Sequence, residues 1–373
     1  MRTLQAERQT LGELLPDFSA ALGQATLREL EEENGHAIRL FKRTGGPRLL
    51  VPAAQGGLGA SAAQSVRVQR AIGSIAPSLA IATTMHHFSV ASLVETGAED
   101  TGPLLKAVGT RNMLLASGFA EGVTGISVMK PALTATRSRD GYRLNGTKKP
   151  CSLARSMDML TASVVLEEDG GPQVAVALVL ASSDGLTVEP FWGAPVLRAA
   201  ESDAVVLKDV EVAGEQLVRI GTPDEASVDR VQHAGFLWFE LLMSASYLGI
   251  ASGLVEGVLE KGRGEPTERV LLLARLEAAM AGLDSIARAI DAGTPAAELL
   301  TRALLIRYQA QEAIGTTVNA ATALLGGMPF ISGDPRVHLF AEATRCLAFH
   351  PPSLGRAAQP ILDTLTGEPL RLV

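Results

Sequence analysis

A strand-rich centre between two helical stretches most limits the folds open to this chain. Short runs of Val, Ile, Leu and Thr, bounded by Gly, Asp and Ser, predict strands at 113–116, 132–136, 142–144, 158–166, 173–181, 186–191 and 203–212. The chain on both sides repeats apolar residues at helical spacing. The sequence therefore predicts a multidomain α+β protein with helical domains at 1–112 and 223–373 around a β domain at 113–222.

The carboxyl-terminal stretch has the pattern of a helical bundle. Apolar periodicity, proline at helix starts and glycine at helix ends predict four helices, at 236–259, 267–290, 294–325 and 334–349. His350-Pro351-Pro352 ends the last one, because proline excludes helical backbone angles from the residue before it. Four long helices with short links predict a four-helix bundle.

The amino-terminal stretch predicts helices at 4–40, 62–72 and 77–94. Ser61 and Gln64 form a capping box that starts the second of these. His86 and His87 lie in the third. Adjacent side chains on a helix point about 100° apart, so these two cannot both ligate one metal ion from one face. No third ligand has suitable spacing, and we expect no metal site.

Composition and charge exclude several classes of protein. The 373 residues carry a net charge of −7 without acidic or basic blocks, so we expect no nucleic-acid partner. Cys151 and Cys346 are far apart and form no disulfide framework, which fits a cytoplasmic protein. The first residues lack the apolar core of a signal peptide. Phe236–Leu259 carries Glu240 and Glu256, so we expect a buried core helix and no membrane span.

Turn signals organise the middle of the chain. A glycine-bearing loop at 118–125 leads into two β-rich runs joined by Arg139-Asp140-Gly141, and Asp-Gly is the strongest short hairpin signal. Asn145-Gly146 predicts a second tight turn before Lys148–Ser152. A glycine-bearing loop followed by a hairpin can offer backbone N–H groups to an anionic cofactor.

The residues Arg-Asp-Gly-Tyr-Arg-Leu-Asn-Gly-Thr-Lys-Lys from Arg139, followed by Ser152, resemble the middle domain of acyl-CoA dehydrogenases. The resemblance implies a helical domain, a middle β-barrel and a four-helix bundle, with FAD bound in a homodimer or homotetramer. In that family the loop before the hairpin wraps the flavin, which implies contacts at Ala120, Glu121 and Gly125. The loop after the hairpin places a hydroxyl beside the flavin, which implies this role for Ser152.

The resemblance also locates the reacting group. Leu325-Gly326-Gly327 and Glu342-Ala343 align with family motifs, and the family's catalytic glutamate then falls on His350. Flavin-dependent monooxygenases of the same fold, which resemble dibenzothiophene and phenol hydroxylases, carry histidine there in the pattern of Arg345 to Pro352. That group also uses a serine at the Ser152 position and a histidine from the amino-terminal helical domain.

Several assignments have alternatives. His350 is an acid or base candidate near neutral pH, but a histidine at a helix C-terminus can simply complement the helix dipole. His86 or His87 would be the amino-terminal histidine, although both fit packed positions. Glu240 lies one position from the base of a branched-chain-type subgroup, and burial would raise the pKa of its carboxyl toward that of a base.

Other differences from the family concern flavin retention. The segment that reaches the FAD of the partner subunit is shortened to Gly262-Arg263-Gly264, and Ala323 and Ile126 replace the family's Gln and Ser. Arg263, Gly326 and Gly327 nevertheless occupy positions where family members bind the cofactor. These differences imply FAD, FMN or a loosely bound reduced flavin, or the loss of flavin.

The sequence thus predicts a flavin-dependent oxidoreductase with His350 in place of the family's catalytic glutamate. Its substrate would be either an acyl thioester, carried by CoA or by an acyl carrier, or a small organic molecule. A flavin reductase or an electron-transfer flavoprotein would be its redox partner. One alternative is a reduced-flavin-dependent monooxygenase. Another is a non-redox binding scaffold that has lost flavin.

Overall fold

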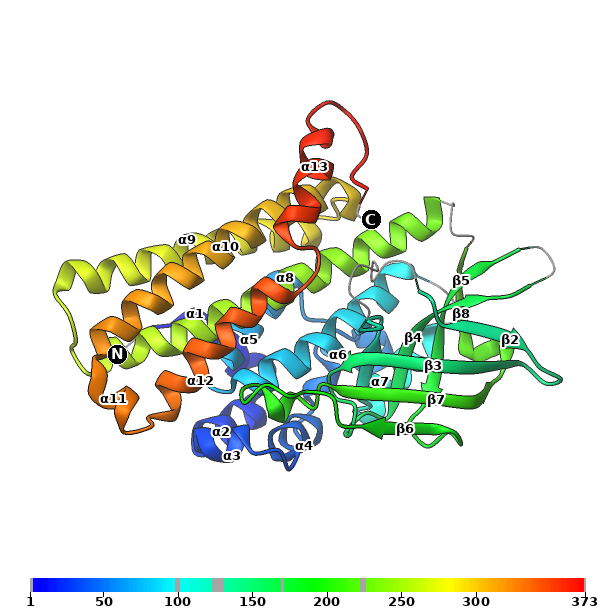
Figure 1. Ribbon diagram of the computed structural model, residues 1–373, viewed down its shortest axis with the longest axis horizontal. Coiled ribbons are helices and arrows are strands. Elements are labelled where there is room, and N and C mark those ends of the chain that lie inside the picture. The colour runs from blue at the N-terminus through cyan, green and yellow to red at the C-terminus, as the bar shows by residue number, and fades with distance from the viewer. Residues whose placement is uncertain (1–2, 98–100, 123–130, 169–170, 222–225, 372–373) are drawn as a thin grey trace.

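The structure is a computed structural model that describes residues 3–97, 101–122, 131–168, 171–221 and 226–371. Helices fill most of the molecule and the sheet forms one end of it (Figure 1). The amino-terminal helices are α1 (Gln5–Leu14), α2 (Pro16–Gln24), α3 (Leu27–Glu31), α4 (His36–Arg43), α5 (Ala62–Gly73), α6 (Pro77–Thr96) and α7 (Gly102–Arg111). The carboxyl-terminal helices are α8 (Ala226–Glu260), α9 (Pro266–Asp291), α10 (Ala296–Leu325), α11 (Gly327–Ile331), α12 (Pro335–Thr344) and α13 (Leu354–Thr364).

The eight described strands form one mixed sheet, and seven of them overlap the strands predicted from the sequence, whereas β8 was not predicted. They are β1 (Leu115–Gly118), β2 (Thr134–Arg137), β3 (Tyr142–Cys151), β4 (Met159–Leu166), β5 (Gln173–Leu180), β6 (Leu186–Glu189), β7 (Asp203–Val212) and β8 (Leu217–Gly221). The order is β6-β7-β3-β2-β4-β5-β8, and β1 pairs in parallel with β4. No pairing of β6 with β8 is described, so the expected closed barrel is not confirmed.

The structure confirms the predicted hairpin, but the prediction of a second turn is wrong. Arg139–Gly141 joins β2 to β3, which pair antiparallel. Asn145 and Gly146 instead lie inside β3, where the register against β7 is irregular. The reason is a cross-strand contact, since Asp209 of β7 donates its backbone N–H to Asn145 Oδ1 at 2.9 Å. Asn-Gly therefore makes an irregularity in a long strand and not a turn.

Helix α8 is the axis of the helical part. It packs against α5, α6, α9, α10 and α12 (Figure 1). The segment His233–Glu260 is long and apolar enough to cross a membrane, but 94% of its most apolar window is buried inside the protein. This confirms the expectation of a buried core helix. Contact with α5 is close enough to require glycine, because a Cβ on Gly249 would lie 2.3 Å from Arg70 O.

Helix α5 shows how distant segments are joined. Ser61 and Gln64 form the predicted capping box. Asp291, at the end of α9, accepts hydrogen bonds from the backbone N–H groups of Ala62 and Ala63 at 2.7 and 3.1 Å. A carboxylate there satisfies two N–H groups that the helix leaves unpaired and also faces the positive end of the helix dipole. The first turn of α5 is thereby fixed to the bundle.

The chain after α12 differs from the prediction. The expected helix at 334–349 ends at Thr344, and a 3₁₀ segment, η6 (Arg345–Phe349), continues to His350. His350 is extended, with φ −71° and ψ 134°, as a residue before proline should be. Helix α13, which was not predicted, stands out from the rest of the molecule (Figure 1).

Replacing Asp291 tests the link between α9 and α5. We expect Asp291→Ala to lower the free energy of unfolding by about 0.5–2 kcal/mol, the range measured for lost helix caps. Urea denaturation followed by circular dichroism would measure this. Glu312→Ala removes the same charge from an exposed position of α10 and should change stability far less. Equal effects of the two variants would contradict the role given to Asp291.

Candidate functional site

His350 lies against one face of α8. Its Nε2 is 3.0 Å from the hydroxyl of Tyr247. The ring centroids of Phe239 and Tyr247 lie 5.8 and 5.6 Å from that of the imidazole, and the ring planes make angles of 68° and 53° with it. Tyr247 is 1% exposed, whereas His350 remains partly accessible. The imidazole therefore has one side in the protein interior and one side open.

Arg307 of α10 holds the segment that carries His350. Its guanidinium donates to the backbone carbonyls of Leu347 and His350, both at 2.8 Å, and of Pro352 at 3.4 Å. Carbonyls at the end of a helical segment lack intrahelical partners. Since Arg307 is only 1% exposed, these bonds fix the position of the segment from inside the protein.

Glu240 of α8 meets the same guanidinium. Its Oε2 lies 3.4 Å from Arg307 Nε, and both side chains are almost completely buried. Glu240 Oε1 has no hydrogen-bond partner among the described residues. Burial raises the pKa of Glu240 to about 8, and the charge of Arg307 offsets only part of this effect. The structure thus brings two predicted candidates, Glu240 and His350, to one arginine.

The pKa of His350 is lowered to about 4, first by burial and second by the charge of Arg307. The imidazole is therefore neutral at pH 7. This differs from the expectation of a group that titrates near neutral pH, because the sequence does not reveal the buried cation beside it.

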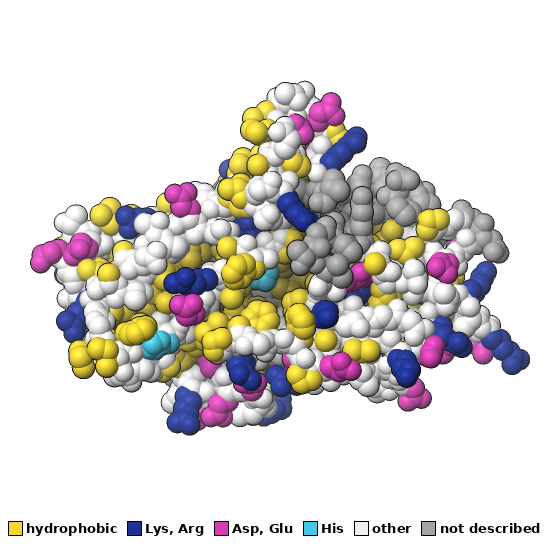
Figure 2. Space-filling view, viewed as in Figure 1, with side chains coloured by type: hydrophobic (Ala, Val, Ile, Leu, Met, Phe, Trp, Pro, Cys, Tyr) yellow, Lys and Arg dark blue, Asp and Glu magenta, His cyan; other side chains and the backbone are white. Residues whose placement is uncertain are grey.

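A row of aromatic rings runs from His350 toward the sheet. The ring of Phe239 lies 5.5 Å from that of Phe88 of α6, which lies 6.1 Å from that of Phe119. Phe119 directly precedes the loop that the resemblance assigns to the flavin. Hydrophobic side chains also gather in a hollow in the middle of this face, between the helices and the sheet (Figure 2). We call Phe239, Phe88 and Phe119 the aromatic row.

The two neighbouring histidines of α6 have different surroundings. His86 is buried, with Nε2 2.8 Å from Pro47 O and Nδ1 accepting from the backbone N–H of Leu115 at 3.1 Å. Burial lowers the pKa of His86 to about 4. Both ring nitrogens are hydrogen-bonded to backbone groups, so His86 fixes the start of β1. His87 is equally buried, but neither of its nitrogens has a hydrogen-bond partner in the described part of the chain.

Glu121 closes the loop predicted to wrap the cofactor. Its carboxylate accepts from the backbone N–H groups of Ala132 and Leu133 at 3.0 Å and from Lys148 Nζ at 2.6 Å. Ala120 O accepts from the N–H of Lys149 at 2.9 Å. The side chain of Glu121 and the carbonyl of Ala120 are therefore committed to the protein itself.

Ser152 lies in the buried turn after β3. Its hydroxyl is 2.9 Å from that of Ser202, which is also buried. No hydrogen bond joins Ser152 to His350 in the described part of the chain. Gly125 and Ile126 lie outside the described residues.

The remaining predicted cofactor contacts gather at the far end of the bundle. Arg263 follows α8, about 30 Å along the helix axis from Glu240. A Cβ on Gly264 would lie 2.9 Å from the side chain of Leu324 at the end of α10. Gly326 ends α10 and Gly327 starts α11. These three residues therefore lie near one another at the far end of the bundle, away from His350.

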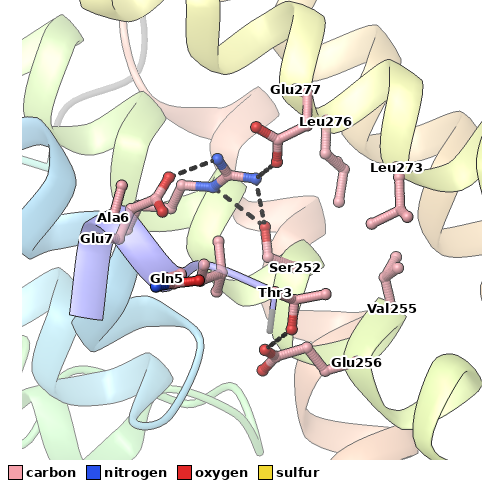
Figure 3. Close-up of a pocket in the computed structure, with 12 residues that line it drawn as sticks. Thr3, Gln5, Ala6, Glu7, Ser252, Val255, Glu256, Leu273, Leu276 and Glu277 are labelled. Carbon is pink, nitrogen blue, oxygen red and sulfur yellow. Dashed lines mark hydrogen bonds and ion pairs between the residues drawn. The ribbon is translucent and has the colours of Figure 1, made fainter. Parts of the chain in front are cut away.

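A cavity of about 370 Å³ lies between α1, α8 and α9, away from His350 (Figure 3). Arg70, 1% exposed, donates to Glu7 at 2.8 Å and to Glu277 at 2.6 Å, and also bonds Ser252. The lining charges therefore satisfy one another. This polar cluster joins helices and offers no free group for chemistry.

Tyr247 and Arg307 were not predicted from the sequence. Tyr247 follows Glu240 by about two helical turns, so the two share a face of α8. That spacing could have identified it. Arg307 continues the buried row of Leu300 and Leu304 on α10 at helical spacing. A charged residue at a core position of a helix is the signal that was overlooked.

Removing the Arg307 guanidinium should destabilise the protein strongly. We expect Arg307→Met to lower the free energy of unfolding by about 3–5 kcal/mol, because it leaves buried polar groups without partners. Arg302→Met, at an exposed position of the same helix, should change it by less than about 0.5 kcal/mol. Denaturant melts of both variants would measure this, and a small effect of Arg307→Met would contradict the described bonding.

Known proteins resemble this chain along nearly its whole length. No family model matches the chain. The isobutylamine N-hydroxylase of Streptomyces viridifaciens is 42% identical over 380 aligned positions, which span all of both chains. The structure of KijD3 with FMN and an amino-keto sugar nucleotide superposes with a TM-score of 0.84 at 19% identity, over 98% of this chain and 95% of that one. FMN-bound TdsC from Paenibacillus sp. A11-2 superposes with a TM-score of 0.82 at 19% identity, over 98% of each chain.

The two structures show the fold, and the N-hydroxylase shows the family. They agree with the resemblance read from Arg139–Ser152 and from the His350 segment. The chain belongs to the acyl-CoA dehydrogenase superfamily of flavoproteins, in the flavin monooxygenase branch that includes isobutylamine N-hydroxylase.

Proposed function

We propose that this protein uses reduced flavin and dioxygen to hydroxylate the nitrogen of a small primary alkylamine. The family makes it a flavin-dependent oxidoreductase, which sets aside the non-redox scaffold. The observation that carries the proposal is the match over all of both chains with an isobutylamine N-hydroxylase, together with an imidazole, His350, at the position where the resemblance puts the carboxylate base of dehydrogenases. The other carboxyl candidate, Glu240, is buried on Arg307. These features favour the monooxygenase alternative over dehydrogenation of an acyl thioester.

The residues present fit a flavin. The aromatic row offers an apolar wall beside the loop closed by Glu121, and the buried hydroxyl of Ser152 is a donor of the kind that flavin ring nitrogens accept. Ser152 and the backbone of Ala120, Glu121 and Gly125 would hold the ring of FAD or FMN. When bound, the flavin supplies the electrons that activate dioxygen.

A second copy of the chain would complete the cofactor site. Arg263, Gly326 and Gly327 lie at the end of the bundle far from Glu240. Within one chain, they therefore cannot contact a flavin that is bound near Glu240. Beside them α11 exposes Met328, Phe330 and Ile331, whose side chains are 59–76% exposed. Contiguous exposed apolar side chains mark association surfaces. We therefore propose a homodimer or homotetramer in which these residues contact the flavin of the other copy.

The proposed reaction balances with dioxygen as oxidant. One oxygen atom enters an N–H bond of the amine, and the other leaves as water with the two electrons and two protons of the reduced flavin. The amine must be uncharged to act as a nucleophile, although free alkylamines have pKa values near 10, as lysine does. An apolar wall disfavours the ammonium form. The aromatic row would therefore hold the alkyl group and promote loss of the proton.

Supplying the purified enzyme with reduced FMN or FAD, air and isobutylamine tests the function. We expect formation of the hydroxylamine, detected by mass spectrometry. A parallel experiment adds an acyl-CoA panel without oxygen and follows flavin reduction by absorbance. Flavin reduction by an acyl-CoA, with no hydroxylamine from any amine, would return the protein to the dehydrogenases.

His350 should be essential for turnover. We expect His350→Ala to lower the rate of hydroxylamine formation by roughly 10²–10³-fold, the usual contribution of an oriented hydrogen-bond donor. His338→Ala, on α12, should not change it. Since burial and Arg307 hold the pKa of His350 near 4, the wild-type rate should not fall through protonation of this group between pH 7 and about 5.5. A loss of activity with a midpoint near 6.5 that disappears in His350→Ala would contradict this environment.

Ser152 and Ser202 provide a matched pair of variants. Each alanine substitution removes the same hydrogen bond, so both should destabilise the protein by about 0.5–1.5 kcal/mol. Only Ser152→Ala should also weaken flavin binding and change oxygen consumption by reduced flavin. Fluorescence titration with FMN and an oxygen electrode would measure this. Identical flavin behaviour in the two variants would count against the contact assigned to Ser152.

A further inference from the structure

The hydroxyl of Tyr247 has one available acceptor. The side chain is 1% exposed, and His350 Nε2 at 3.0 Å is its sole hydrogen-bond partner among the described residues. Burial raises the pKa of Tyr247 well above 10, so the phenol keeps its proton. A buried O–H group needs an acceptor. The phenol must therefore donate to Nε2.

This bond determines where the proton of the imidazole lies. A neutral histidine has one nitrogen that donates and one that accepts. If Nε2 accepts from Tyr247, the proton is on Nδ1. In the opposite tautomer Nε2 would donate to Tyr247, and the buried phenol O–H would lose its acceptor.

The second nitrogen faces the open side of the ring. His350 Nδ1 has no hydrogen-bond partner in the described part of the chain, and it is not among the buried unpaired polar atoms, so it is accessible. Arg307, bonded to the carbonyl of His350, places a positive charge behind the ring. That charge opposes protonation of the imidazole, which would otherwise make both nitrogens donors.

We infer that Tyr247 is a positioning residue that fixes His350 as the Nδ1–H tautomer, so that the imidazole presents a hydrogen-bond donor to the reaction and not a base. The inference rests on the proposed function for its catalytic meaning. During N-hydroxylation the oxygen atom that leaves as water gains a proton, and a donor at that atom assists its departure. The neutral imidazole keeps its Nδ1 proton and stabilises that oxygen through a hydrogen bond, while the protons of the water are those of the reduced flavin.

Nitrogen NMR tests the tautomer without turnover. Protein labelled with ¹⁵N-histidine should show one neutral ring with a protonated Nδ1 and an unprotonated Nε2, and its signals should be absent from His350→Gln. In Tyr247→Phe that ring should change toward a mixture of tautomers. Tyr308→Phe is the matched control, because Tyr308 donates to Pro352 O in the same segment but does not bond the imidazole.

Coupling of oxygen consumption to product gives the catalytic readout. We expect Tyr247→Phe to lower the hydroxylamine formed per dioxygen consumed roughly tenfold, with more hydrogen peroxide and an unchanged KM for the amine, since one positioning bond is lost. Tyr308→Phe should stay near wild type. A wild-type His350 protonated on Nε2 would overturn the inference, as would unchanged NMR signals and coupling in Tyr247→Phe.

The NMR result separates this inference from the proposed function. If the wild type hydroxylates no amine, the proposed function fails, yet the spectrum still decides the tautomer. If Tyr247→Phe does not fold, the wild-type spectrum alone remains decisive.

Discussion

One buried guanidinium organises the site. Arg307 joins α10 to Glu240 of α8 and to the backbone of the segment that carries His350. The bond to the carbonyl of His350 positions the imidazole, and burial together with the charge of Arg307 lowers the pKa of the ring. A buried guanidinium is costly to leave without hydrogen-bond partners. Arg307 has such partners, because it donates to backbone carbonyls that would otherwise be unpaired.

Much of the fold could be predicted from the sequence because it rests on local patterns. The strand-rich centre, the capping box of Ser61 and the buried α8 follow from periodicity and helix signals. The failures come from longer-range contacts. Asn145-Gly146 has a turn signal, but its cross-strand bond to Asp209 keeps it within β3. Helix α13 was not predicted, because it follows Pro351-Pro352 and carries Pro360 in its interior, and proline is typical of helix ends.

The site was predictable only in part. A motif located His350, and helix position drew attention to Glu240, but nothing in the pattern showed that both meet Arg307. The pKa values of these groups depend on burial, which arises from packing between α8 and α10. His86 shows the opposite case, since a histidine that the resemblance offered as a catalytic candidate is bonded to the backbone of Pro47 and Leu115. The role of a histidine therefore cannot be assigned from residue type alone, because it depends on the hydrogen-bond partners of each ring nitrogen.

The origin of the oxygen atom in the product tests the central claim most directly. The enzyme would be supplied with reduced flavin and isobutylamine under ¹⁸O₂, and the hydroxylamine analysed by mass spectrometry. The account predicts one ¹⁸O atom in each product molecule, none of it exchanged with water. Product without the label, or no oxygenated product from any alkylamine while an acyl-CoA reduces the flavin, would contradict it.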